Sequence, residues 1–265
     1  MTMTRSGGAA VILAVSIITG SHLAGWQEPG VETLRVRGEI RSEGGGPLPN
    51  ARLKTDALRG PGGNQFAGQR VFNARTNKKG EWALLGLTRG LWVFEISAPD
   101  HWPHVVVVPI YMMLKPEPVP WETNLLLMPH DMVKPGGPNP EAAVRHLMDA
   151  ADAAVGGNRQ AAREALMKLV ELTLDVPGLC AAGDIAMLMR EPMTARKFFD
   201  AAAGADPKSY RAQLGIASAS MMLLDFDRAI KGYDMARGAA NDQRLQKMLS
   251  NAVREIQQIR TIGKH

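Results

Sequence analysis

The sequence predicts two domains, an all-β sandwich followed by an all-α array of helical hairpins. All five tryptophans lie in the first half, up to Trp121, whereas alanine and methionine are concentrated in the second half. The first half alternates apolar and polar residues in short segments with Gly and Pro between them, and the second half repeats a helical pattern at a fixed period. A chain of 265 residues is long enough for two domains with buried cores.

The N-terminal segment, residues 1–25, is predicted to be a secretory signal. Arg5 supplies the positive charge, residues 9–18 form an apolar stretch, and small residues near Ala24 offer a cleavage site. An apolar stretch of this length is too short for a membrane span, which needs about 20 residues. Trp26 stands where a lipidated cysteine would be required, so no lipid anchor is expected. The predicted location is therefore periplasmic or secreted, with an uncleaved anchor as the alternative.

A strand pattern begins at Leu34, where Leu34, Val36 and Ile40 face one way and charged residues face the other. The glycine-rich turn at residues 44–47 ends this strand. Further strands are expected at four places, which are residues 51–53, 92–96, 105–108 and 125–127. Short strands between turn signals predict a β-sandwich.

Several segments of this half resemble a known family. They are VRGEI at 36–40, PLPNA at 47–51, TNKKGEW at 76–82, GL at 86–87, GLW at 90–92 and SAPDHW at 97–102. Together they are similar to the carboxypeptidase regulatory-like domain. The resemblance implies a Greek-key sandwich of transthyretin-like or carbohydrate-binding-like fold over residues 34–130, without peptidase activity. Two departures are the Asp100-His101 pair, which replaces a usual glycine, and the long connection 54–75.

The second half begins after a Pro- and Gly-rich linker, residues 131–140, and is expected to be helical over residues 141–262. Its main signal is a triad that recurs after 34 residues: Ala195, Phe199 and Ala202 reappear as Ala229, Tyr233 and Ala236. With Leu179, Gly183, Ala186 and Pro207 in order, this spacing resembles the tetratricopeptide repeat. The unit at 141–175 is degenerate, and residues 243–260 are predicted to form a capping helix. The alternative is a generic helical bundle.

The resemblance to the tetratricopeptide repeat also points to a candidate site. In that family the first helix of each pair lines a concave face, which implies a peptide-binding groove formed by Asp184, Met187, Ser218 and Met221. Methionine adapts to varied apolar partners. The equally weighted alternative is that the two methionines simply pack the core.

Tryptophans give a second candidate site. Trp102 and Trp121 are the candidate sugar-stacking residues, because aromatic rings on a sandwich can stack on sugar rings. Trp82 and Trp92 are expected in the core instead.

Other chemistry is not expected. His101, His104 and His130 are interpreted as surface or loop residues, with no metal site and no cofactor. Cys180 is expected to be a buried apolar residue. No hydrolase motif occurs, and the basic residues are interspersed with acids, so nucleic-acid binding is not expected despite a formal charge of +5.

The sequence thus favours a non-catalytic exported scaffold or adaptor that binds a protein or peptide partner in the cell envelope through its helical repeats. The alternative is a carbohydrate-binding module in which the sandwich is the working part and the helices are an adaptor. A hydrolase is a third interpretation, and it lacks a motif.

Overall fold

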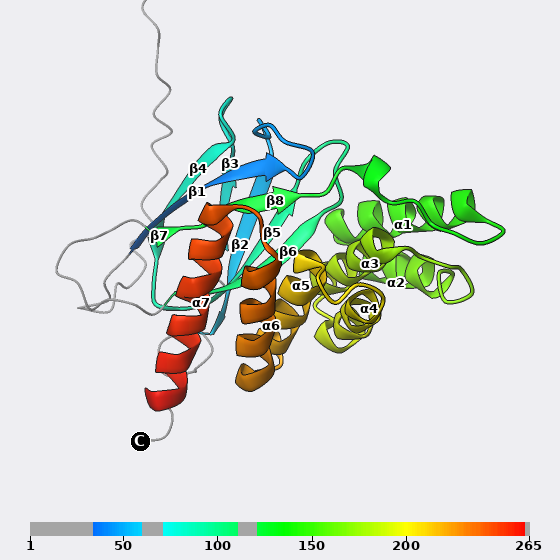
Figure 1. The fold of residues 1–265 in the computed structure, drawn as a ribbon. Coiled ribbons are helices and arrows are strands. Elements are labelled where there is room, and N and C mark those ends of the chain that lie inside the picture. The colour runs from blue at the N-terminus through cyan, green and yellow to red at the C-terminus, as the bar shows by residue number, and fades with distance from the viewer. Residues whose placement is uncertain (1–33, 60–70, 111–120, 263–265) are drawn as a thin grey trace, which may run out of the picture. The chain divides into compact units, whose positions relative to one another are not determined.

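The computed structural model describes residues 34–59, 71–110 and 121–262, which belong to one compact unit. Within this part, two β-sheets come first in the chain and seven α-helices follow (Figure 1). The predicted fold class, a β-sandwich followed by helical hairpins, is therefore confirmed. The predicted signal, residues 1–25, lies outside the described residues, and the proposed domain boundaries stay a prediction.

The first sheet is built around β1 (Leu34–Ser42). This strand pairs antiparallel with β4 (Glu81–Leu87), and parallel with β7 (Trp121–Glu122) and β8 (Leu125–Leu127). The burial of β4 alternates as the period-two pattern requires for a strand with one exposed face.

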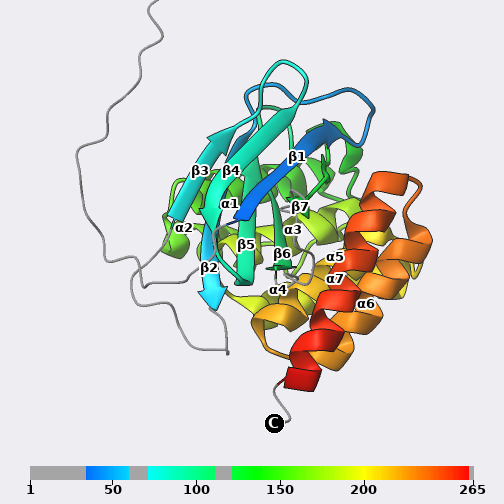
Figure 2. The ribbon, with the colours of Figure 1, turned by 90° about the vertical axis from the view of Figure 1, so that its left-hand side faces the viewer.

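The second sheet has the antiparallel order β3-β2-β5-β6. Its strands are β2 (Arg52–Arg59), β3 (Val71–Arg75), β5 (Gly90–Ser97) and β6 (His104–Ile110). The sheets meet through Trp82 of β4 and Phe94 of β5, whose ring centroids lie 5.8 Å apart. Figure 2 shows the strands in front of α1, α2 and α3, with α6 and α7 beside them.

Strands β5 and β6 differ from β4 because both of their faces are covered. All seven residues of β6 are buried, and only two residues of β5 are not. Helices α3, α5 and α7 pack against β6. The run of four valines at 105–108 suits a strand that is buried on both faces.

A 3-10 turn, η2 (His130–Met132), precedes the helices. The helices are α1 (Pro140–Val155), α2 (Arg159–Met167), α3 (Val176–Leu188), α4 (Pro192–Ala205), α5 (Tyr210–Met222), α6 (Phe226–Ala239) and α7 (Gln243–Ile262). Consecutive helices pack on each other as hairpins. At the start of α3, α5 and α6, the side chains of Asp175, Ser209 and Asp225 cap free main-chain N–H groups.

The three hairpins share one turn geometry. The first helix of each pair ends before a residue in the left-handed region: Gly157 (φ 81°), Arg190 (φ 63°) and Leu224 (φ 60°). In each, the next residue donates its N–H to a carbonyl of the last helical turn, as in Asn158 to Ala153 at 2.8 Å. This recurrence supports the repeat over the generic bundle.

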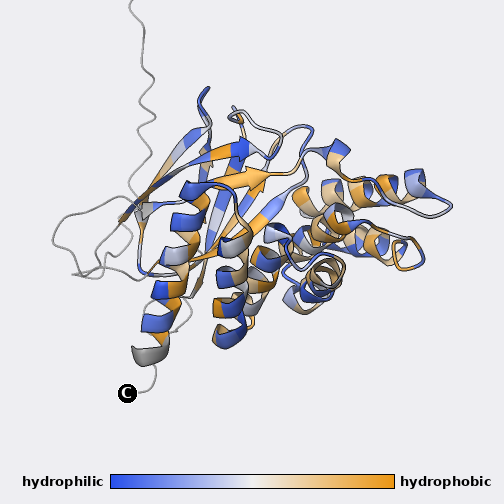
Figure 3. Cartoon of the chain, in the orientation of Figure 1, coloured by the Kyte–Doolittle hydropathy of each residue, from blue (hydrophilic) through white to orange (hydrophobic). Residues whose placement is uncertain are grey.

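The recurring aromatic residues fill the spaces that the sequence predicts. Phe199 is fully buried, and its ring lies so close to Gly183 and Gly215 that a Cβ on either would lie 2.6 Å or 2.3 Å from it. The predicted capping helix is α7, which carries both hydrophilic and hydrophobic bands (Figure 3). Among the described helices, none is long and apolar enough to cross a bilayer.

Candidate functional site

The four residues predicted to line a peptide-binding groove lie on α3 and α5, and all are buried. Asp184 keeps 1% of its surface exposed, and Met187, Ser218 and Met221 keep none. Strand β6 packs against both helices (Figure 1). These residues therefore do not line an open groove, because the chain's own strand β6 covers this surface. Their use by a separate peptide stays a prediction, and the burial of the methionines agrees with a core role.

The contact between β6 and the helices includes hydrogen bonds to the strand's main chain. The N–H of Val105 donates to Oδ1 of Asp184 at 3.0 Å, and the N–H of Val107 donates to Oγ of Ser218 at 3.3 Å. From α6, the hydroxyl of Tyr233 donates to the carbonyl of Val107 at 2.6 Å. We call the surface formed by Asp184, Ser218 and Tyr233 the β6-binding face.

An edge strand normally exposes a row of main-chain groups that lack a partner. Along a strand, every second residue points its main-chain N–H toward the same edge. After Val105 and Val107, the next such residue on this edge of β6 is Pro109, which has no N–H. On this edge of β6, the main-chain N–H groups of Val105 and Val107 are thus bonded to side chains of the helices, and Pro109 has no N–H that would need a partner. The helices take the place that a further strand would occupy.

A cluster of polar and charged side chains is buried beside these hydrogen bonds. Nδ1 of His104 lies 3.0 Å from both carboxylate oxygens of Asp184 and 3.2 Å from Nη1 of Arg211. Nη1 of Arg211 also donates to Oδ2 of Asp184 at 3.3 Å. These side chains are 5% exposed or less. Buried charges are tolerated only where they are paired and hydrogen-bonded, so this cluster ties β6 to α3 and α5.

Arg211 extends the cluster to Glu43, which follows β1. Nε of Arg211 donates to Oε1 of Glu43 at 2.8 Å, and the hydroxyl of Tyr210 donates to the same oxygen. Burial raises the pKa of Glu43, but the charge of Arg211 and these hydrogen bonds outweigh it, so the pKa lies below its ordinary value. Burial lowers the pKa of Arg211, but the nearby carboxylate of Glu43 acts in the opposite direction. The pKa of Arg211 therefore lies above its ordinary value. Both groups are therefore charged at neutral pH.

The side chains of this cluster are buried and paired with one another, so they connect the sheet to the helices and do not face a substrate-sized opening. The nearby Cys180 is buried as expected, and burial raises the pKa of its thiol to about 12, so it stays protonated at neutral pH. Within the described ranges, no group of three His, Cys, Asp or Glu side chains could hold a metal ion.

Two predictions for aromatic and imidazole side chains need correction. Trp102 is fully buried and packs edge-on against His130 at 4.7 Å, so it offers no face to a sugar. Trp121 belongs to β7, and its side chain lies outside the described part. His104 is not a surface residue but a buried partner of Asp184.

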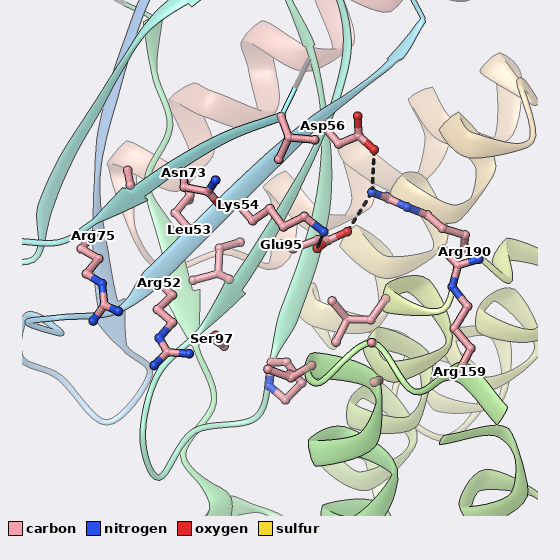
Figure 4. A pocket seen from close by; sticks show the side chains of 18 residues that line it. Arg52, Leu53, Lys54, Asp56, Asn73, Arg75, Glu95, Ser97, Arg159 and Arg190 are labelled. Atoms are coloured by element: carbon pink, nitrogen blue, oxygen red, sulfur yellow. Dashed lines mark hydrogen bonds and ion pairs between the residues drawn. The ribbon is translucent and has the colours of Figure 1, made fainter. Parts of the chain in front are cut away.

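A feature that the sequence did not reveal is an open cleft of ≈ 1150 Å³ between β2, β3 and β5 on one side and the α1–α2 and α3–α4 turns on the other. Among the described residues that line it, only Asp56 and Glu95 carry carboxylates. The cationic residues that line it are Arg52, Lys54, Arg75, Arg159 and Arg190 (Figure 4). We call this the basic cleft.

Two of the five cations in the basic cleft are neutralised by the two carboxylates. Nη2 of Arg190 lies 3.3 Å from Oδ2 of Asp56 and 2.7 Å from Oε1 of Glu95. Nζ of Lys54 lies 3.1 Å from Oε2 of Glu95. Three guanidinium groups have no ion pair within the described part of the chain, and they are those of Arg52, Arg75 and Arg159. These residues are far apart in the sequence, so the fold and not the sequence brings them to one cleft.

Comparisons with known proteins give a limited result. No protein-family model matches the chain, and no curated protein matches it. Solved structures similar to part of it include the Sgt2 TPR domain from Aspergillus fumigatus, with 16% identity, a TM-score of 0.41, and coverage of 47% of this chain and 85% of that one. The first TPR domain of human RPAP3 has 15% identity, a TM-score of 0.41, and coverage of 48% and 98%. PcrH in complex with the chaperone binding region of PopB has 17% identity, a TM-score of 0.38, and coverage of 45% and 98%.

Proposed function

We propose that this chain is a non-catalytic adaptor that is exported to the cell envelope and binds a protein or peptide partner. The observation that carries the proposal is the way the helical hairpins meet an extended strand. Asp184, Ser218 and Tyr233 bond to the main chain of β6, and main-chain contacts of this kind bind extended segments largely independently of their side chains. Stacked helical hairpins are typically binding surfaces.

The absence of catalysis is proposed on chemical grounds. A catalytic group must be within reach of its substrate. His104, Asp184 and Arg211 are sealed between β6 and the helices, and the two carboxylates of the basic cleft are engaged in ion pairs. Export is proposed from the signal-like pattern of residues 1–25. No observation on the described tryptophans favours the carbohydrate-binding alternative.

The adaptor proposal is tested with the full chain as bait. Partners are cross-linked in the envelope fraction, and each candidate is then purified and titrated against the purified chain. The double variant Ser218→Ala/Tyr233→Phe weakens the β6-binding face, and Ser250→Ala serves as the matched control because its hydroxyl bonds only within α7.

A partner that enters the β6-binding face must displace β6, so its binding to the wild type and to Ser250→Ala should make the N–H of Val107 exchange faster with solvent. In the double variant this N–H already lacks its acceptor, so partner binding should change its exchange much less. A partner that binds elsewhere should leave the exchange of this N–H unchanged in all three. The proposal fails if no purified candidate binds, or if the purified chain turns over a substrate. Export is checked separately by N-terminal sequencing, and full-length protein recovered from the cytosol would contradict it.

A further inference from the structure

We propose that the basic cleft binds an acidic segment of a partner protein, whose carboxylates pair with Arg52, Arg75 and Arg159. The inference rests on the proposed function for its premise that the partner is a protein. It adds where the partner binds and what chemistry the partner carries.

The charge of the cleft is the first argument. The carboxylates of Asp56 and Glu95 already form ion pairs with Arg190 and Lys54. The guanidinium groups of Arg52, Arg75 and Arg159 therefore remain to bind a ligand. Arginine presents its N–H donors in a planar fork that matches a carboxylate in two-point contact. In Figure 4, Arg52 and Arg75 extend from adjacent strands, while Arg159 lies on the helical side of the cleft. An anionic chain lying across the cleft would meet all three.

The position of Arg159 is the second argument. It is the first residue of α2, directly after the N-cap Asn158. The positive end of the helix dipole disfavours a cation there, by a few tenths of a kcal/mol at an exposed site. Helix stability therefore does not account for this arginine. Together with the N-terminus of α2, it makes the helical wall attractive to an anion.

The uncharged lining narrows the class of ligand. No Trp, Tyr or Phe is among the described residues that line the cleft. Nucleic acids and sugars are commonly bound by stacking on aromatic rings, and the cleft offers no such platform. Val71 and Val155 also line it, and they are 40% and 48% exposed. These two side chains suit a segment in which acidic residues are interspersed with apolar ones.

The cleft is also held in shape before a ligand arrives. Arg190 comes from the helical side and pairs with Asp56 of β2 and Glu95 of β5, so these contacts bridge the two walls. A site that is already ordered loses less conformational entropy on binding. The bridging ion pairs thus position the cleft, and the three free arginines contact the ligand.

The test is a selection of peptides from a random displayed library on the full chain. Enriched peptides should be rich in Asp and Glu interspersed with apolar residues. One is then labelled, and its binding is followed by fluorescence anisotropy with the wild type and with Arg52→Gln/Arg75→Gln. We expect the dissociation constant to rise by about tenfold in the double variant, as for the loss of two charge-assisted hydrogen bonds in a partly open site. The control Arg145→Gln/Lys168→Gln changes the net charge equally but lies outside the cleft and should bind as the wild type does.

Several outcomes would overturn the inference. These are the absence of enriched peptides, the enrichment of neutral or basic ones, equal weakening by the control variant, and tighter competition by inorganic phosphate, a sulfated oligosaccharide or single-stranded DNA than by the acidic peptide. Thermal unfolding of both variants verifies that they fold. If the envelope partner still binds the Arg52→Gln/Arg75→Gln variant as tightly as the wild type, the cleft assignment fails while the adaptor function stands. If no partner protein binds at all, the adaptor function fails.

Discussion

The β3-β2-β5-β6 sheet has β6 at one edge and β2 and β3 toward the other. We call these the β6 side and the β2–β3 side, and they differ in whether their polar groups find hydrogen-bond or ion-pair partners within the chain. On the β6 side, main-chain N–H and C=O groups and buried charges find partners on α3, α5 and α6. On the β2–β3 side, three guanidinium groups of the basic cleft lack an ion pair within the described part of the chain. An uncovered edge strand invites pairing with other chains, so covering it protects the fold. Among the described residues, the polar groups at the β6 edge thus find partners within the chain, whereas three guanidinium groups on the β2–β3 side do not form ion pairs.

This difference predicts opposite responses to substitution. Changes on the β6 side should alter stability, because buried groups would lose their partners. Changes at the three exposed arginines of the basic cleft, Arg52, Arg75 and Arg159, should alter binding but leave stability nearly unchanged, as is usual for exposed positions.

The largest expected effect is that of Asp184→Ala. It leaves the buried guanidinium of Arg211 with less opposite charge and the N–H of Val105 without an acceptor. Removing one partner of a buried ion pair costs about 3–5 kcal/mol. Chemical denaturation should show this loss, whereas Arg75→Gln in the cleft should change stability by less than about 0.5 kcal/mol. Equal losses for the two variants would remove the distinction between the two sides.

Local patterns in the sequence were enough to predict five of the strands, the helical hairpins and much of the core, but not β3 or β7. The alternation from Leu34 predicted β1, and the recurrence of Phe199 as Tyr233 predicted two buried aromatics, which are 0% and 1% exposed. Both patterns arise within one element or one repeat, where spacing along the chain sets the direction of each side chain. The resemblance to the carboxypeptidase regulatory-like domain stays a prediction.

The contact between the sheet and the helices was not predicted. It depends on pairs such as His104 with Asp184, which are 80 positions apart and follow no period. One signal was available, because the valines at 105–108 are apolar at every position and so imply that both faces of this strand are buried. The second face needed a cover, and the helices were the part of the chain that could supply it.

An intermediate effect is expected for Glu43→Gln, and it should depend on pH. The pKa of Glu43 lies below the ordinary value of 4.5 in the folded state, so its stabilising contribution is fully present above that value. As the pH falls through the folded pKa, the carboxylate is protonated and the contribution is lost. At neutral pH the variant should lose about 1.5–3 kcal/mol, as for a hydrogen bond to a charged group.

Below pH 4.5, the free energy of unfolding should fall less steeply for Glu43→Gln than for the wild type. Denaturant titrations at a series of pH values measure both slopes. Glu122→Gln is the matched control, because Glu122 pairs with Arg37 on the surface at 45% exposure. Its curve should run parallel to that of the wild type. Parallel curves for Glu43→Gln as well would mean that Arg211 does not depend on this carboxylate.

The smallest effect is expected for Ser218→Ala, which removes the acceptor for the N–H of Val107. The loss of one hydrogen bond should cost about 1 kcal/mol and make this amide exchange with solvent about five times faster. The amide of Val106, on the alternate side of the strand, is the internal reference and should change much less. If Val107 exchanges no faster in the variant, apolar packing alone holds β6 against the helices. The two sides of the sheet would then differ in burial and not in how their hydrogen bonds are satisfied.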